Sequence, residues 1–228
     1  MRAGWGAGIV GAAAVVGAIT AAVACAGGNH GEPPGRVTRL SATDISFPAT
    51  VHTAGFASRW AMPGYHAVVW RGGGAAGAAL LRADVTDVQV LDALEALGAR
   101  PGDALGMATW DERGDAKSAA ADAVIQGPPV EVLVRLPGQP RPLPLADLLE
   151  DHGGRGVELR LGGHRANIPR WHSGCIVCLY SCPGSKLGNA RYTVRDYVRD
   201  PARFRPRLDL LPKDGTRVEV IVRLTGKG

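Results

Sequence analysis

One short segment holds the side chains best suited to chemistry. It runs His172-x2-Cys175-x2-Cys178-x3-Cys182-Pro183. With a cysteine in place of His172, this would be the C-x2-C-x2-C-x3-C-P run that ligates iron–sulfur clusters. A two-residue gap lets a tight turn aim successive side chains at one point, and the proline stops that turn from continuing as a helix. The spacing therefore predicts a metal centre held by Cys175, Cys178 and Cys182, with His172 as the fourth ligand.

Three thiolates and one imidazole suit more than one metal. An iron–sulfur cluster such as 4Fe–4S, with one histidine-ligated iron, follows from the spacing, and zinc follows from the Cys3His ligand set. A soft ion such as Cu(I) is also compatible. Against a cluster, an exported chain folds in a compartment without obvious cluster assembly, whereas zinc needs none. We expect the cluster, acting as an electron carrier, and keep zinc in a binding module as the alternative.

A third interpretation needs no metal. Outside the cytoplasm, Cys175 and Cys178 are spaced to close a disulfide, which would make the chain a thiol–disulfide oxidoreductase and leave Cys182 unpaired. The third cysteine, the histidine in register and the following proline favour metal. No set of residues is nominated as catalytic, so the chain is expected to be a non-enzymatic protein.

Positive charge gathers around the same segment. Residues 159–228 hold 14 basic and 5 acidic side chains, whereas residues 32–158 hold 11 and 16, and this excess favours the ionised form of nearby thiols. Arginines recur every four residues from Arg191 to Arg203, although Pro201 interrupts the helix they would share. Such a face suits a redox partner protein or the membrane surface. Nucleic acid is not expected as a partner, because it conflicts with export.

The elements that must position this segment are short. Thr86 and Gln89 form a capping box at the start of a helix that Gly98 ends, and Thr193 is expected to cap a second helix. A short helix is predicted at 145–150. Strands are predicted at 65–70, 78–85, 130–136, 157–161 and 218–224. This pattern predicts an α+β fold with a mixed or mostly antiparallel sheet, a few short helices and a Cys-rich metal-binding loop segment.

The N-terminus has the parts of an export signal. Residues 1–24 begin with a basic side chain, continue as an apolar stretch and end in the cleavage site Ala22-Val23-Ala24. Cys25 follows directly, as at the acylated cysteine of bacterial lipoproteins; plain secretion and an uncleaved anchor are the alternatives. Each predicts an exported, membrane-associated or secreted domain. Residues 25–43 form a Pro/Gly-rich tether, and residues 44–228 form the domain.

Composition sets limits on the class of protein. The chain has 228 residues, of which 46% are hydrophobic and 21% charged, values that exclude wholesale disorder. Four cysteines are too few for a disulfide-stapled scaffold. Beyond the N-terminus no run approaches the roughly 18 apolar residues of a spanning helix.

At this level the chain resembles a known family. The Cys-rich segment 172–189, in which Lys186 and Asn189 follow the cysteines, is similar to that of the YdjY-type proteins, and so is the following Tyr192-Thr193 pair. The resemblance covers most of residues 45–225. It implies a ferredoxin-like or metal-binding bacterial lipoprotein displayed on the outer side of a membrane, with an iron–sulfur centre. It implies neither a substrate nor an oligomeric state.

Overall fold

The structure is a computed structural model that describes residues 35–58, 64–102, 105–163, 165–201 and 203–226. By its internal contacts the chain divides into residues 1–31 and residues 32–228. The predicted signal peptide, Cys25 and the first part of the tether lie outside the described residues. None of the helices in the described ranges is both long enough and apolar enough to cross a membrane.

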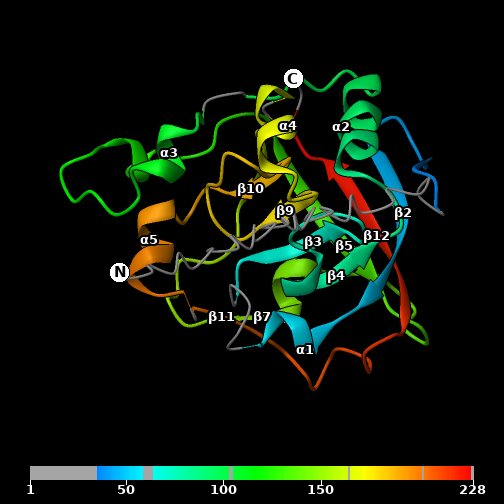
Figure 1. The fold of residues 1–228 in the computed structure, drawn as a ribbon. Helices are drawn as coiled ribbons and strands as arrows, with labels where there is room; N and C mark the ends of the chain where they lie inside the picture. The colour runs from blue at the N-terminus through cyan, green and yellow to red at the C-terminus, as the bar shows by residue number, and fades with distance from the viewer. Residues whose placement is uncertain (1–34, 59–63, 103–104, 164, 202, 227–228) are drawn as a thin grey trace, which may run out of the picture. The chain divides into compact units, whose positions relative to one another are not determined.

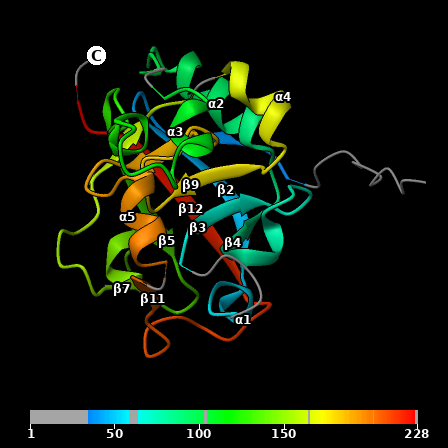
Figure 2. The ribbon, with the colours of Figure 1, turned by 60° about the vertical axis from the view of Figure 1, so that its left-hand side comes forward.

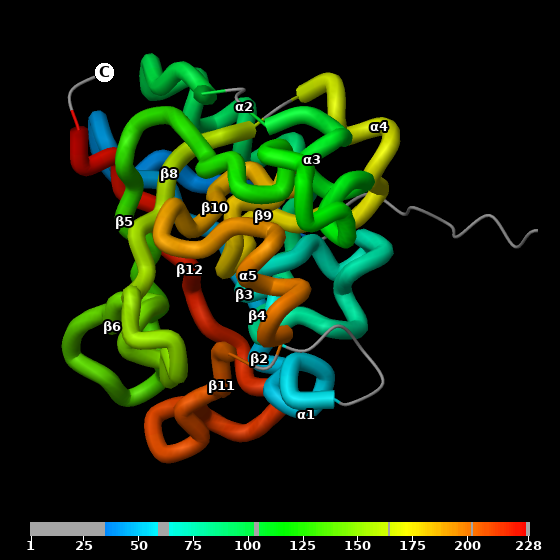
Figure 3. The backbone as a smooth tube through the Cα atoms, turned by 90° about the vertical axis from the view of Figure 1, so that its left-hand side faces the viewer, coloured from blue at the N-terminus to red at the C-terminus, as the bar shows by residue number. Residues whose placement is uncertain are grey.

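Eight strands pair in a closed ring (Figures 1 and 3). Their order is β2–β12–β5–β8–β10–β9–β3–β4, and β4 pairs back onto β2. The neighbours β9–β10 and β3–β4 are parallel, and the other pairs in the ring are antiparallel. The ring strands are β2 (Asp44–Val51), β3 (His66–Trp70), β4 (Ala79–Ala83), β5 (Pro129–Arg135), β8 (Leu159–Leu161), β9 (Cys175–Cys178), β10 (Leu187–Asn189) and β12 (Arg217–Leu224).

Short elements complete the chain. Two strands extend the ring, β1 (Thr38–Arg39) beside β2 and β6 (Leu143–Pro144) beside β5, while β7 (Leu149–Asp151) and β11 (Phe204–Pro206) form a separate ribbon. The α-helices are α1 (Thr53–Phe56), α2 (Asp87–Ala96), α3 (Ala108–Asp111), α4 (Ile168–Trp171) and α5 (Val194–Arg199). The 3-10 turns are η1 (Ala76–Ala78), η2 (Ala120–Asp122), η3 (Leu145–Leu148) and η4 (Arg165–Asn167).

The predicted α+β class is wrong. The sheet closes into a mixed β-barrel because Ala49–Val51 of β2 pair antiparallel with Leu81–Ala83 of β4, so no open sheet remains for a helical layer to cover. Even the longest helix described, α2, has only ten residues. The ferredoxin-like fold that the resemblance implies is likewise not found. Alternation of side chains identifies a strand but not its partner, and closure depends on partners that lie far apart in the sequence.

Local predictions fare better than the fold class. Strands lie in each of the five predicted segments, and the Thr86–Gln89 capping box of α2 is present in both directions. Thr193 caps α5 in the same way. The Gly-rich stretch that follows β3 continues through η1 into β4, which pairs parallel with β3. The predicted helix at 145–150 is instead the turn η3 followed by β7.

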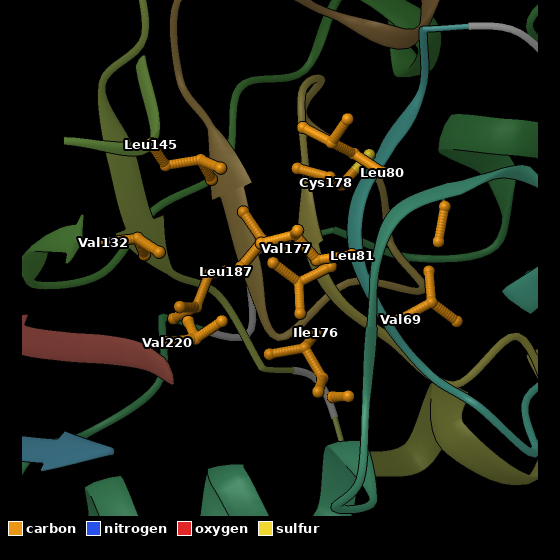
Figure 4. Packing of buried hydrophobic residues seen from close by; sticks show 14 of the residues in the cluster. Val69, Leu80, Leu81, Val132, Leu145, Ile176, Val177, Cys178, Leu187 and Val220 are labelled. Carbon is orange, nitrogen blue, oxygen red and sulfur yellow. The ribbon is translucent and has the colours of Figure 1, made fainter. Parts of the chain in front are cut away.

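The barrel is filled by aliphatic side chains from several strands. Figure 4 shows Val177 of β9 and Leu187 of β10 close to Leu81 of β4, all within one buried hydrophobic cluster. Cys178, next in the chain after Val177, lies beside Leu80 instead. Successive residues of a strand point to opposite faces. Cys178 therefore belongs to the outward face of β9.

Helices lie over parts of the barrel surface. In Figures 1 and 2 α2 and α4 lie at one end of the barrel and α1 at the other. Figure 3 shows the α3 segment and α5 passing in front of β9 and β10. The outward face of β9 is thus enclosed between the barrel wall and the segments that carry α3 and α5.

We expect the β5–β8 junction to be sensitive to one glycine. Only two residue pairs join these strands, and Gly127 lies beside them with φ +120°, where an added Cβ would stand 2.0 Å from the Leu161 carbonyl oxygen. Gly127→Ala should lower the free energy of unfolding by roughly 3 kcal/mol or more, because strain and a clash combine. Gly138 has φ +77° and open space around an added Cβ. Gly138→Ala should therefore lower the free energy of unfolding by only about 1 kcal/mol. Equal losses in urea unfolding would contradict this account.

Candidate functional site

Two irregularities between β3 and β9 set the direction of the cysteines. In a regular strand, side chains three apart in sequence point to opposite faces, which would separate Cys175 from Cys178. The register of β9 on β3 shifts twice, so that His66 pairs with Cys178, Val68 with Val177 and Val69 with Cys175. Ile176 is thereby an extra residue on β9, a β-bulge. The bulge brings Cys175 and Cys178 to the same face, in a strand rather than in the predicted loop.

The nitrogen closest to these sulfurs comes from β3. His66 pairs directly opposite Cys178, and side chains directly opposite each other share one face of a sheet. Its Nδ1 lies 3.3 Å from Cys175 Sγ, and the imidazole is 6% exposed. His66 precedes Cys175 by 109 residues, so local spacing gave no indication of it. Its position within the strand predicted at 65–70 is the one available signal.

The third sulfur is held by a tyrosine. Tyr65 donates its hydroxyl to Cys182 Sγ at 2.7 Å, and its backbone oxygen accepts from Cys178 Sγ at 3.5 Å. Both other cysteines are among the groups that raise the pKa of Cys178. All three described cysteines are free and buried.

The three thiols are not electrostatically equivalent. Burial raises the pKa of Cys175, but a hydrogen bond from Cys178 and the charge and hydrogen bond of His66 outweigh it, and the pKa falls to about 5. Burial and the neighbouring sulfurs hold the pKa of Cys178 well above its ordinary value. Burial and the cysteines also raise the pKa of Tyr65, which keeps its hydroxyl a donor. The site therefore favours one thiolate beside one protonated thiol.

A buried ion pair supports this arrangement. Lys186 is 2% exposed, and its Nζ lies 2.7 Å from Asp87 Oδ2 at the start of α2. The same ammonium donates to the Gly184 carbonyl at 3.1 Å. Its charge is one of those that lower the pKa of Cys175. A buried charge needs such partners, and here they join the first turn of α2 to the segment that follows the cysteines.

The structure places His172 apart from this cluster. It follows α4 as the C-cap in the left-handed conformation, with φ 44°, and its side chain is exposed. Its backbone oxygen accepts from Gly74 N at 2.9 Å. This backbone hydrogen bond of His172 joins the end of α4 to the Gly-rich stretch. His66 takes the place beside the sulfurs that the sequence assigned to His172.

A pocket of about 490 Å³ opens over the site. Cys175, Cys182 and His66 line it, together with the aromatic side chains of Tyr65, Trp110 and Trp171. Cys178 is not among the lining residues. Two of the three sulfurs therefore border a space large enough for a small molecule.

The three thiols and the imidazole are donors that suit a soft metal, but their side chains are not arranged to hold one ion. Among the described residues, no group of three or more His, Cys, Asp and Glu side chains is placed to hold a metal ion. The sulfurs have Tyr65 and His66 as hydrogen-bond partners. Metal binding here requires deprotonation of the thiols.

The arginines after the site lie among acidic or aromatic side chains. Arg191 pairs with Glu158 at 2.9 Å, and the buried Arg195 pairs with Asp122 at 2.7 Å. Arg203 stacks over the Tyr192 ring at 4.8 Å and lies 3.7 Å from Asp200 Oδ2. Three of the four arginines that recur from Arg191 to Arg203 therefore have a carboxylate partner. Asn189 is fully buried, and its side chain bonds three backbone groups, those of Gly156, Glu158 and Arg191, which is a structural role.

We expect His66→Asn to raise the pKa of Cys175 by roughly one unit or more, because it removes the charge that favours the thiolate. The measurement is thiolate absorbance against pH in chelator-treated protein, in which the titration of one thiol near pH 5 should move to higher pH. His152→Asn, at an exposed histidine beside Glu150, is the matched control. Identical titration curves for both variants would refute the role given to His66.

Comparison with known proteins identifies one domain family. The YdjY domain family matches residues 40–223. The chain is 25% identical over 160 residues to "Uncharacterized protein YdjY" of Escherichia coli (strain K12), an alignment that covers 70% of this chain and 67% of that protein. No solved structure matches the chain. Because the family match spans most of the sequence and contains the whole sulfur site, the chain belongs to the YdjY domain family.

Proposed function

We propose that this protein binds a soft metal through the thiolates of Cys175, Cys178 and Cys182, with His66 as the nitrogen ligand. The observation that carries the proposal is the meeting of three free, buried sulfurs and one imidazole on the outward face of β9 and β3. Thiolate and imidazole donors suit zinc, copper and iron. Bound iron would supply one-electron transfer, whereas zinc would be redox-silent.

The number and type of donors favour a single ion. Three thiolates and one imidazole complete the four positions of a tetrahedral ion. In a 4Fe–4S cluster each cysteine binds a different iron. The charges of Lys186 and His66 offset the negative charge of the thiolates in either case.

An iron–sulfur electron carrier is the second candidate function. Two observations favour it: the ligand spacing in the sequence, and the pocket beside Cys175 and Cys182, which gives a cluster room to extend. In that case the nearby aromatic side chains would shield the centre from water. Tyr65, Trp110 and Trp171 stand around it, with Tyr180 stacked on Tyr65 at a centroid distance of 5.8 Å.

The proposed location is outside the cytoplasm. It rests on the apolar stretch and cleavage pattern of residues 1–24, with Cys25 as the acylated N-terminus of a lipoprotein. A redox partner protein or the membrane surface would then be the neighbour of the domain. The ion pairs within the arginine stripe leave little free positive charge there, so acyl attachment carries this part of the proposal.

Metal analysis of protein purified without oxygen tests the proposal. We expect about one zinc or iron per chain, and Cys178→Ser should abolish uptake. His66→Asn should weaken metal affinity by at least roughly tenfold, the lower end of the effect of a side chain that only supports a ligand. His172→Asn, which retains a residue that tolerates the left-handed conformation, should bind as the wild type does.

The metal also decides between the candidates. Brown protein with iron and sulfide in equal amounts would establish the cluster, and colourless protein with one zinc would establish the single ion. Metal-free protein whose Cys175 and Cys178 form a reversible disulfide would overturn metal binding and favour a thiol–disulfide oxidoreductase. Loss of metal in His172→Asn but not in His66→Asn would contradict the ligand set.

A further inference from the structure

We infer that the pocket over Cys175 and Cys182 binds a quinone, a flat and uncharged ring that carries two carbonyl oxygens. The inference deepens the proposed function and rests on it, because it names the small molecule that approaches the sulfur site. Its evidence is the shape, charge and polar groups of the pocket lining.

One wall of the pocket is built from aromatic rings. The centroids of Tyr65 and Trp110 lie 5.7 Å apart with their planes at 60°, and those of Trp110 and Trp171 lie 5.2 Å apart at 76°. Rings set at such angles form a concave apolar surface. Trp171 is also fixed in place, because its Nε1 donates to Met107 Sδ at 2.8 Å. A pre-organised wall lowers the cost of binding a rigid ring.

The rest of the lining includes residues with little or no side chain. Gly74, Ala75, Gly77 and Ala78 line the pocket, and none of them has a side-chain atom beyond Cβ. These positions leave room for a flat ring beside the tryptophans. The volume of about 490 Å³ is within the range of pockets for small molecules and has space for a ring system of one or two rings.

The lining selects against charge. No Lys, Arg, Asp or Glu is among the described residues that line the pocket. A charged ligand would lose its hydration there, and apart from the sulfur site no opposite charge would compensate for that loss. A ligand with neutral acceptor groups has partners. Ser173 Oγ accepts from Cys175 N at 3.2 Å, which leaves its hydroxyl proton for donation, and the His66 ring adds a polar edge. Carbonyl oxygens match these donors.

The test uses the full chain and two matched probes. The first is 2,3-dimethyl-1,4-naphthoquinone, whose methyl groups block the ring positions that thiolates attack, and the second is 2,3-dimethylnaphthalene, which lacks the carbonyls. Equilibrium dialysis should show micromolar binding of the quinone and at least about fivefold weaker binding of the hydrocarbon, as expected for the loss of one hydrogen bond. Ser173→Ala should remove most of that difference.

A filled pocket provides the decisive variant. Gly77 lines the pocket and has no atom within 4 Å of an added Cβ, and its φ is not in the left-handed region. Gly77→Leu should weaken quinone binding at least tenfold. Gly114→Leu has equally open space but is absent from the lining, and it should bind as the wild type does.

Some outcomes would overturn the inference. The first is that the wild type does not bind the quinone at any concentration up to its solubility. The second is that Gly77→Leu, shown by circular dichroism to be folded, binds the quinone as tightly as the wild type. The third is that the wild type has equal affinity for the two probes. Metal content measured on the same samples keeps the two proposals apart. Normal metal uptake without quinone binding would refute this inference alone, whereas quinone binding without metal uptake would refute the proposed function.

Discussion

The sulfur site depends on a mismatch between two neighbouring strands. A regular pairing of β3 with β9 would send Cys175 and Cys178 to opposite sides of the barrel wall, one into the aliphatic core. The paired register shifts, with Ile176 as the extra residue, turn both toward the same side and set His66 opposite them. Bulges are enriched next to functional sites because they re-aim side chains in this way. The shared direction of Cys175, Cys178 and His66 depends on these two shifts.

Burial gives the site its chemical character. The three thiols and the imidazole are buried, and the result is an uneven set in which one thiol is acidic and its neighbour is not. The nearby Lys186–Asp87 pair is also buried. Such groups are costly to bury, so the fold must hold them tightly. The tyrosines, tryptophans and the α3 and α5 segments around them serve this purpose as much as any contact with a ligand.

The sequence was informative where the evidence is local. The Thr86–Gln89 capping box, the strand periods and the grouping of three cysteines all depend on neighbours within a few residues. Barrel closure depends on β2 meeting β4, and the nitrogen donor depends on β3 meeting β9. Neither strand pairing is apparent from the spacing of residues in the sequence. His172 was assigned for its distance along the chain, although its left-handed backbone turns it into a helix terminus.

The separation of His66 from the cysteines has an effect on folding. They are 109 residues apart, so an ion shared between them would close a very long loop in the disordered chain. Cross-links of that span remove chain entropy from the denatured ensemble, much as a disulfide does. The shared ion would then link the two halves of the polypeptide where β3 pairs with β9. Metal binding would therefore depend on complete assembly of the barrel.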